Sequence, residues 1–121
     1  MLQPIEQSAA YKKLLLRPKT ELSKLSFLID RFKEMTLTVI YEGHEYDQDK
    51  AAQYAKKFLQ QNYHTKGEGS AEKWVKEYCY RSEASKQVII FRYPDKTEKP
   101  ARDVMLVELE ELNKTLTQSK K

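Results

Sequence analysis

Apolar residues recur every three or four positions in four stretches of this chain, which is the spacing of one helix face. These stretches cover residues 22–32, 51–59, 74–79 and 105–116. Residues 1–19 contain a further run of helix-forming residues, which Pro18 is expected to end. The pattern therefore predicts four helices and a helical arm in front of them.

Three other segments follow a strand pattern. In residues 36–41, β-branched and aromatic residues alternate with others, and residues 44–46 follow after Glu42 and Gly43. Because glycine tolerates a positive φ, this pair predicts a tight hairpin with two central residues. Residues 87–93 have an unbroken apolar centre, typical of a strand that is central or buried on both faces. Residues 94–100 are polar and predict a loop.

The predicted order of elements is α, α, β, β, α, α, β, α. This order indicates an α+β fold, with a small sheet of about three antiparallel strands packed against four to five helices on one face. Thr20, Ser70 and either Asp47 or Asp49 are the expected N-caps, and Asp103 is the expected start of the last helix.

The chain length is that of one domain, since 121 residues leave no room for a second full core. We expect an N-terminal helical arm at 1–19, a single α+β domain at 20–116 and a frayed, disordered tail at 117–121. The arm carries the apolar triplet Leu14, Leu15 and Leu16. This triplet either packs on the core of the domain or, with the help of Lys12, Lys13 and Arg17, contacts a partner or a membrane surface.

The net charge of +4 is concentrated at the two ends of the chain. Residues 1–19 carry a net charge of +3 and residues 117–121 carry +2, so that the body between them has −1. A nucleic-acid-binding domain needs several cations on one face of its folded body. The charge distribution therefore argues against nucleic-acid binding, and leaves a cytoplasmic nucleic-acid-binding or regulatory protein that uses its basic termini as the alternative.

The location of the protein is not fixed by its sequence. The chain contains no stretch of 18 apolar residues that could span a bilayer, and its start lacks the features of a signal peptide. We expect a cytoplasmic protein, or a periplasmic one if the chain is a mature form without its leader. The single cysteine, Cys79, cannot form an internal disulfide, so it does not indicate the redox compartment.

The order of short motifs at residues 42–47, 51–54, 70–75 and 81–86 resembles an uncharacterised family of small exported bacterial proteins, which includes enterobacterial YfeK. The resemblance covers about residues 20–116. Gly43, Tyr46, the pair Ala51 and Ala52, and Ser82 match the family pattern, whereas Glu42 replaces its Asn and Tyr54 replaces its His. The resemblance implies export to the periplasm. It implies no known activity, and any role of the replaced His does not carry over.

Candidate chemistry is sparse. His44, His64 and Cys79 do not have the spacing of metal ligands, and Cys79 shares a helix face with Trp74 and Val75, where a thiol is inert. The carboxylates near the hairpin are explained by a helix cap and a solvated turn. The sequence therefore predicts a protein that is not an enzyme and has no cofactor or metal. A small hydrolase with a site near Glu45 and His64 is a third hypothesis.

Contact with a partner is the function that the sequence favours. Tyrosine and arginine are enriched at interface hot spots, and an apolar, basic arm is a second contact element. The candidate interaction residues are Tyr41, Tyr46, Arg81, Arg92, Leu15 and Lys12. The leading hypothesis is a small non-enzymatic domain that binds a protein or a cell-envelope component.

Overall fold

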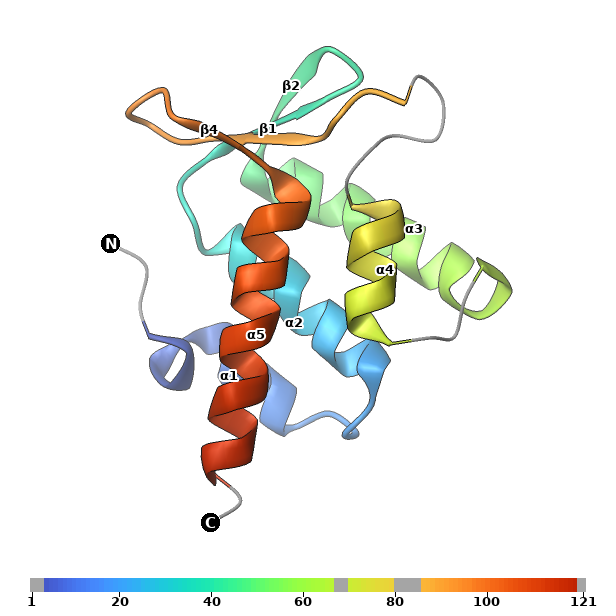
Figure 1. Ribbon diagram of the computed structural model, residues 1–121, viewed down its shortest axis with the longest axis vertical. Helices are drawn as coiled ribbons and strands as arrows, with labels where there is room; N and C mark the ends of the chain where they lie inside the picture. The colour runs from blue at the N-terminus through green and yellow to red at the C-terminus, as the bar shows by residue number, and fades with distance from the viewer. Residues whose placement is uncertain (1–3, 67–69, 80–85, 120–121) are drawn as a thin grey trace.

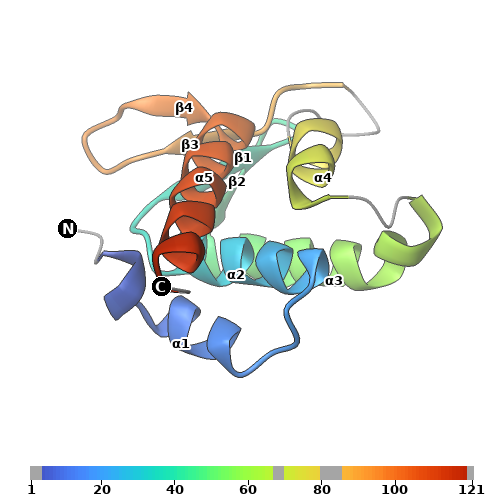
Figure 2. The same ribbon diagram turned by 60° about the horizontal axis from the view of Figure 1, so that its bottom comes forward.

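The computed structural model describes residues 4–66, 70–79 and 86–119, and arranges them as a sheet on one side of a group of helices (Figure 1). The described residues form five α-helices and a four-stranded antiparallel sheet. The predicted α+β class is therefore confirmed, with four strands in place of about three. Figure 2 shows that the helices lie on one side of the sheet.

The helices begin largely where the local chemistry predicts. After a 3-10 turn, Ile5–Gln7, they are α1 (Ala9–Leu15), α2 (Glu21–Lys33), α3 (Gln48–Lys66), α4 (Ala71–Tyr78) and α5 (Ala101–Ser119). The hydroxyl oxygens of Thr20 and Ser70 each accept a hydrogen bond from the N–H three residues later, both at 3.1 Å. Asp47 accepts one from the Lys50 N–H at 2.7 Å. These three N-caps are confirmed.

The last helix differs from its prediction at both ends. It begins at Ala101, two residues before Asp103, and its helical backbone continues through residues 117–119, which the sequence predicts as part of a frayed tail. The first turn directly continues the preceding strand, and the Ala101 N–H donates to the Ile89 carbonyl at 2.9 Å. This backbone bond to the residue before β3 satisfies the first N–H of the helix.

The sheet has the order β2-β1-β3-β4, and its strands are β1 (Thr38–Tyr41), β2 (His44–Asp47), β3 (Ile90–Arg92) and β4 (Glu98–Pro100). Between β1 and β2, Glu42 and Gly43 both have positive φ, at 54° and 76°, as the predicted two-residue hairpin requires. The strand predicted at 87–93 forms only at Ile90–Arg92, and it has the central position expected for it.

The fourth strand corrects the prediction of a polar loop at residues 94–100. The Tyr93 N–H donates to the Thr97 carbonyl at 2.8 Å, and this turn brings β4 beside β3. β4 is an edge strand with charged side chains, Glu98 and Lys99. Polar residues suit an edge strand, because its outer side faces water and its charges discourage pairing with other chains.

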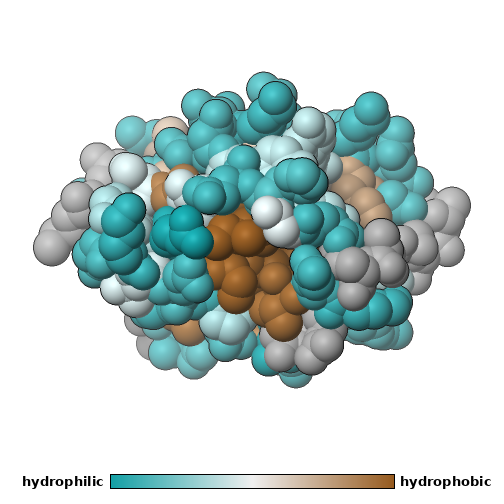
Figure 3. Space-filling model, turned by 90° about the horizontal axis from the view of Figure 1, so that it is seen from above, coloured by the Kyte–Doolittle hydropathy of each residue, from teal (hydrophilic) through white to brown (hydrophobic). Residues whose placement is uncertain are grey.

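Side chains alternate between the two faces of the sheet. Val39 pairs with both Phe91 and Tyr46, so these three residues point to the same, helix-covered face. Ile40 and Ile90 pair on the opposite face, where both are half-buried. Viewed from the end of the molecule that carries the sheet, the surface has an apolar area surrounded by hydrophilic side chains (Figure 3).

The arm packs on the domain and contributes to its core. Ile5, Ala10, Tyr11 and Leu14 are buried, and α1 lies beside α2. In addition, the Ala10 N–H donates to a carboxylate oxygen of Glu34 at 2.7 Å. Of the apolar triplet, Leu14 is buried whereas Leu15 and Leu16 are exposed.

Two charged residues of α2 are buried and paired. One carboxylate, Asp30, contacts both Arg17 of the arm, at 3.0 Å, and Lys56 of α3, at 3.2 Å. The Arg31 guanidinium contacts Glu108 of α5 at 3.1 Å. These pairs connect α2 to the arm, α3 and α5. Loss of one partner of a buried ion pair is strongly destabilising, so the pairs favour this arrangement of the elements.

Candidate functional site

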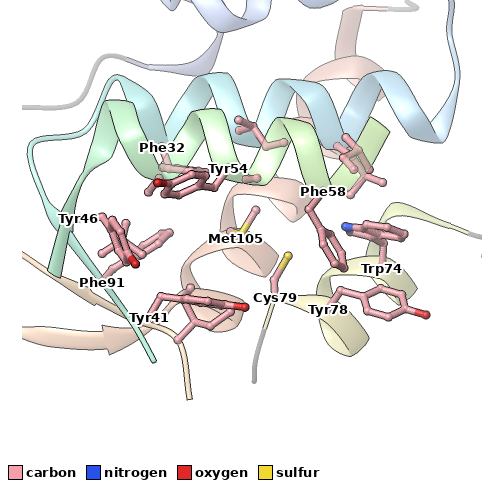
Figure 4. Close-up of a pocket in the computed structure, with 18 residues that line it drawn as sticks. Phe32, Tyr41, Tyr46, Tyr54, Phe58, Trp74, Tyr78, Cys79, Phe91 and Met105 are labelled. Atoms are coloured by element: carbon pink, nitrogen blue, oxygen red, sulfur yellow. The ribbon is translucent and has the colours of Figure 1, made fainter. Parts of the chain in front are cut away.

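An apolar cleft of about 450 Å³ lies between α3, α4 and the helix-covered face of the sheet (Figure 4). Leu25, Ile29 and Phe32 of α2 form its floor, and each is less than 5% exposed. The floor is held against the sheet by Phe32 and Phe91, whose ring centroids are 5.4 Å apart. The cleft is therefore a depression that reaches the centre of the fold.

Three tyrosines form the end of the cleft next to the sheet. Tyr41 lies at the end of β1, Tyr46 in β2 and Tyr54 on α3. The rings of Tyr46 and Tyr54 are nearly perpendicular, at 88°, with centroids 5.6 Å apart. Because Tyr41 is 38% and Tyr54 52% exposed, these residues form part of the rim.

A second aromatic group forms the other end, where α3 faces α4. Trp74 lies between Phe58 and Tyr78, at centroid distances of 5.8 Å and 4.5 Å, and the Phe58 and Tyr78 rings are 6.1 Å apart. All three pairs are tilted, which aromatic rings prefer over a face-to-face sandwich. Trp74 is the only tryptophan of the chain, so it is a built-in reporter for this end of the cleft.

Small and sulfur-containing side chains lie between the two aromatic groups. Ala51 and Ala55 face the cleft from α3, one helical turn apart, and their short side chains leave the volume unfilled. Met105 and Cys79 lie in the middle of the close-up (Figure 4). Desolvation by burial raises the pKa of the Cys79 thiol to about 12, so the thiol stays protonated at neutral pH and is a poor nucleophile.

The described wall of the cleft is apolar and aromatic. Among the described residues, no Asp, Glu, Lys, Arg or His lines it. The polar groups that it offers are tyrosine hydroxyls, the thiol and the indole N–H. In Figure 4 the Tyr41 hydroxyl points into the cleft, toward Cys79, whereas that of Tyr78 points away from it. Such a wall can hold an apolar molecule and orient it by a few hydrogen bonds.

The residues proposed for the hydrolase do not meet. Glu45 is in β2, just before α3 begins, and His64 is in the last turn of α3. A helix rises 1.5 Å per residue, so the backbone of α3 separates them by roughly 24 Å. Glu45 instead contacts Arg92, at 3.2 Å. In the described part of the chain, no three His, Cys, Asp or Glu residues are grouped as metal ligands.

The candidate interaction residues lie in three places. Tyr41 and Tyr46 line the cleft, whereas Arg92 is on the opposite face of the sheet, where it contacts Glu45 and Glu98. Leu15 and Lys12 are exposed on α1, on the far side of α2 from the sheet (Figure 2). Arg81 lies outside the described residues. The structure therefore does not gather the described residues of the set into one patch.

One pattern in the sequence points to the cleft. The residues at 51, 54, 55 and 58 share one face of α3, and this face alternates alanine with large aromatic side chains. The apolar character of this face indicates only that it is buried. The alternation of small and large side chains is nevertheless what leaves a space between rings.

Comparison of the chain with protein-family models, with curated proteins and with solved structures finds no match. The resemblance to the YfeK-containing family therefore stays a prediction. Among the described residues, no helix combines the length and the apolar character needed to cross a membrane.

Proposed function

We propose that this protein is a small, non-enzymatic binding protein that holds an apolar small molecule in the cleft between α3, α4 and the sheet. The observation that carries the proposal is the cleft itself, which has a buried floor, no charged side chain among its described lining residues and a volume of about 450 Å³. Ligand sites in proteins are typically concave, mostly apolar and about 300–1,000 Å³ in volume.

The chemistry of the wall supports binding rather than catalysis. The group of the cleft best suited to nucleophilic attack is Cys79, and burial raises its pKa to about 12. General acid–base catalysis at neutral pH favours groups that titrate near pH 7, and no carboxylate or histidine among the described residues lines the cleft.

Of the partners expected from the sequence, a small apolar component of the cell envelope fits this site better than a protein does. The cleft is a concave space of about 450 Å³ with a buried floor, whereas protein partners use broad surfaces of roughly 800 Å² on each side. The alternative of a nucleic-acid-binding protein that uses its basic termini gains no support from the cleft, because no Lys or Arg among the described residues lines it.

The proposal is tested with N-phenyl-1-naphthylamine, an uncharged apolar dye whose fluorescence rises when it leaves water. We expect saturable binding to the wild-type protein. The variant Ala55→Phe places a ring in the space that Ala55 leaves open, and is expected to weaken binding at least tenfold.

The matched control is Ala9→Phe, which makes the same chemical change on the exposed surface of α1. It is expected to bind the dye like the wild type. Circular dichroism checks that both variants are folded. The proposal is wrong if the dye does not bind, or if Ala55→Phe binds it as well as Ala9→Phe does.

A further inference from the structure

The cleft has a composition that selects among apolar ligands. Its two ends are built of aromatic rings, its middle of alanine and sulfur-containing side chains, and its wall carries no charge among the described residues. We infer that its ligand is an uncharged, flat aromatic molecule of about two to three rings. This inference rests on the proposed function and adds the chemical class of the ligand.

The part of the wall that the structure describes carries no charge, which disfavours ionic ligands. A carboxylate, sulfonate or ammonium group that enters the cleft loses its water and meets no opposite charge from the described residues that line it. Burial of an unpaired charge is far more costly than burial of a hydroxyl that finds a hydrogen-bond partner. The charged form of a ligand is therefore expected to bind much more weakly than its neutral analogue.

The rings of the wall favour a flat ligand over a flexible chain. Tyr46 and Tyr54 are arranged edge to face at one end, and Trp74 packs in a tilted geometry on Tyr78 at the other. A ligand ring placed between these two groups can make ring–ring contacts with both of them. Each favourable ring pair stabilises the complex beyond the burial of apolar surface. A flexible chain gains no such contacts and loses more conformational freedom when it is ordered.

The volume sets the size of the ligand. An apolar cavity of about 150 Å³ accommodates one benzene ring. The cleft has about three times this volume, at 450 Å³, and part of it lies at the open rim near Tyr41 and Tyr54. Two to three fused or linked rings therefore match the space between the floor and the rim.

Three probes separate these features: 2-naphthol, naphthalene-2-sulfonate and 1-decanol. The first two share a ring system and differ in charge at neutral pH. The first and third are both uncharged, with the same number of non-hydrogen atoms, and differ in shape. Each probe is titrated against the wild-type protein that holds N-phenyl-1-naphthylamine, and its affinity is obtained from displacement of the dye.

We expect 2-naphthol to bind at least tenfold more tightly than naphthalene-2-sulfonate. We also expect it to bind at least threefold more tightly than 1-decanol, although the chain has the larger apolar surface. The variant Phe58→Leu keeps an apolar side chain but removes one ring of the wall. The variant should lower the affinity for 2-naphthol about threefold to tenfold, which corresponds to the free energy of one aromatic pair. It should leave the affinity for 1-decanol unchanged.

If Phe58→Leu is not folded, Tyr54→Leu provides the same comparison at the exposed rim, where Tyr54 is 52% exposed. If naphthalene-2-sulfonate binds as tightly as 2-naphthol, the inference that the ligand is uncharged is wrong. If 1-decanol binds more tightly than 2-naphthol, the inference that the ligand is aromatic is wrong. In both cases the dye still binds, so the proposed function survives. Absence of dye binding to the wild type refutes the proposed function itself.

Discussion

The two sides of α2 differ in how completely side chains fill the space beside the helix. On the side of α1 and α5, aliphatic and aromatic side chains interlock, and Phe27, Leu28 and Leu112 are at most 1% exposed. On the side of α3, α4 and the sheet, rings and alanines surround a cleft of about 450 Å³. The first side is filled by buried side chains, whereas the second leaves an open space.

This division matters in a chain with a thin core. Leu, Ile, Val and Phe make up only 27 of its 121 residues. A domain of this size is held by a small net free energy of about 5–15 kcal/mol. Because an unfilled cleft contributes few contacts, the packed side must supply most of this free energy. Substitutions on the two sides are therefore expected to have different consequences.

The largest expected effect comes from removal of the arm. Deletion of residues 1–18 exposes core positions and removes the buried side chains of Ile5, Tyr11 and Leu14. Burial of three such side chains is worth about 5–9 kcal/mol, which is comparable to the whole net stability. We expect the thermal unfolding transition, followed by circular dichroism, to lose its cooperativity.

The matched control removes only residues 120–121 and is expected to unfold like the full chain. If the arm deletion also unfolds in one cooperative transition at an unchanged midpoint, the arm is a contact element and the packed side does not depend on it.

The second prediction compares one phenylalanine from each side of α2. Phe27→Ala creates a cavity in the packed side and is expected to cost about 3–5 kcal/mol in urea unfolding. Phe58→Ala enlarges a cleft that is already open, and its side chain is only half-buried, so we expect a cost of about 1–2 kcal/mol. Equal losses for the two variants would mean that the cleft side is packed as tightly as the other.

The smallest effect concerns a contact between α2 and α4 at one end of the cleft. A carboxylate oxygen of Glu21 accepts the Ala71 N–H at 2.9 Å, and Lys24 lies 3.0 Å from the carboxylate. Burial by itself would raise the pKa of Glu21, but these contacts outweigh it and hold the pKa below its usual value.

Because the pKa is lower in the folded state, the charged carboxylate stabilises the fold above its ordinary pKa of about 4.3. This contribution is lost as the pH falls through the lower, folded-state pKa. Glu21→Gln is expected to make urea stability less dependent on pH between about pH 5 and pH 3. An unchanged dependence in the variant would show that the carboxylate does not hold α4 in place.

The residues next to the ends of several helices and strands were sufficient to predict where these elements begin or end. Thr20 and Ser70 cap helices because their hydroxyls reach the N–H three residues later, whatever the rest of the fold. Gly43 makes the hairpin because it adopts a positive φ of 76°. Such features depend on a few adjacent residues and can be predicted from them.

The rest depends on residues that are distant in the sequence. β4 has no apolar alternation, and it is a strand only because the turn after Tyr93 places it beside β3. The cleft depends on the distance between α3 and α4, which no spacing within either helix specifies. Ala55 and Trp74 lie in stretches for which the apolar spacing predicts helices, but that spacing does not predict the space between the two helices.

One carboxylate of α2 forms ion pairs with both the arm and α3. Asp30 holds Arg17 at the end of the arm and also Lys56 on α3, the helix that carries Tyr54 and Phe58. A displacement of the arm therefore removes one of the two ion pairs that the structure shows for the buried Asp30 carboxylate, and leaves the pair with Lys56. The arm and the helix that forms one side of the cleft thus share one buried carboxylate as an ion-pair partner.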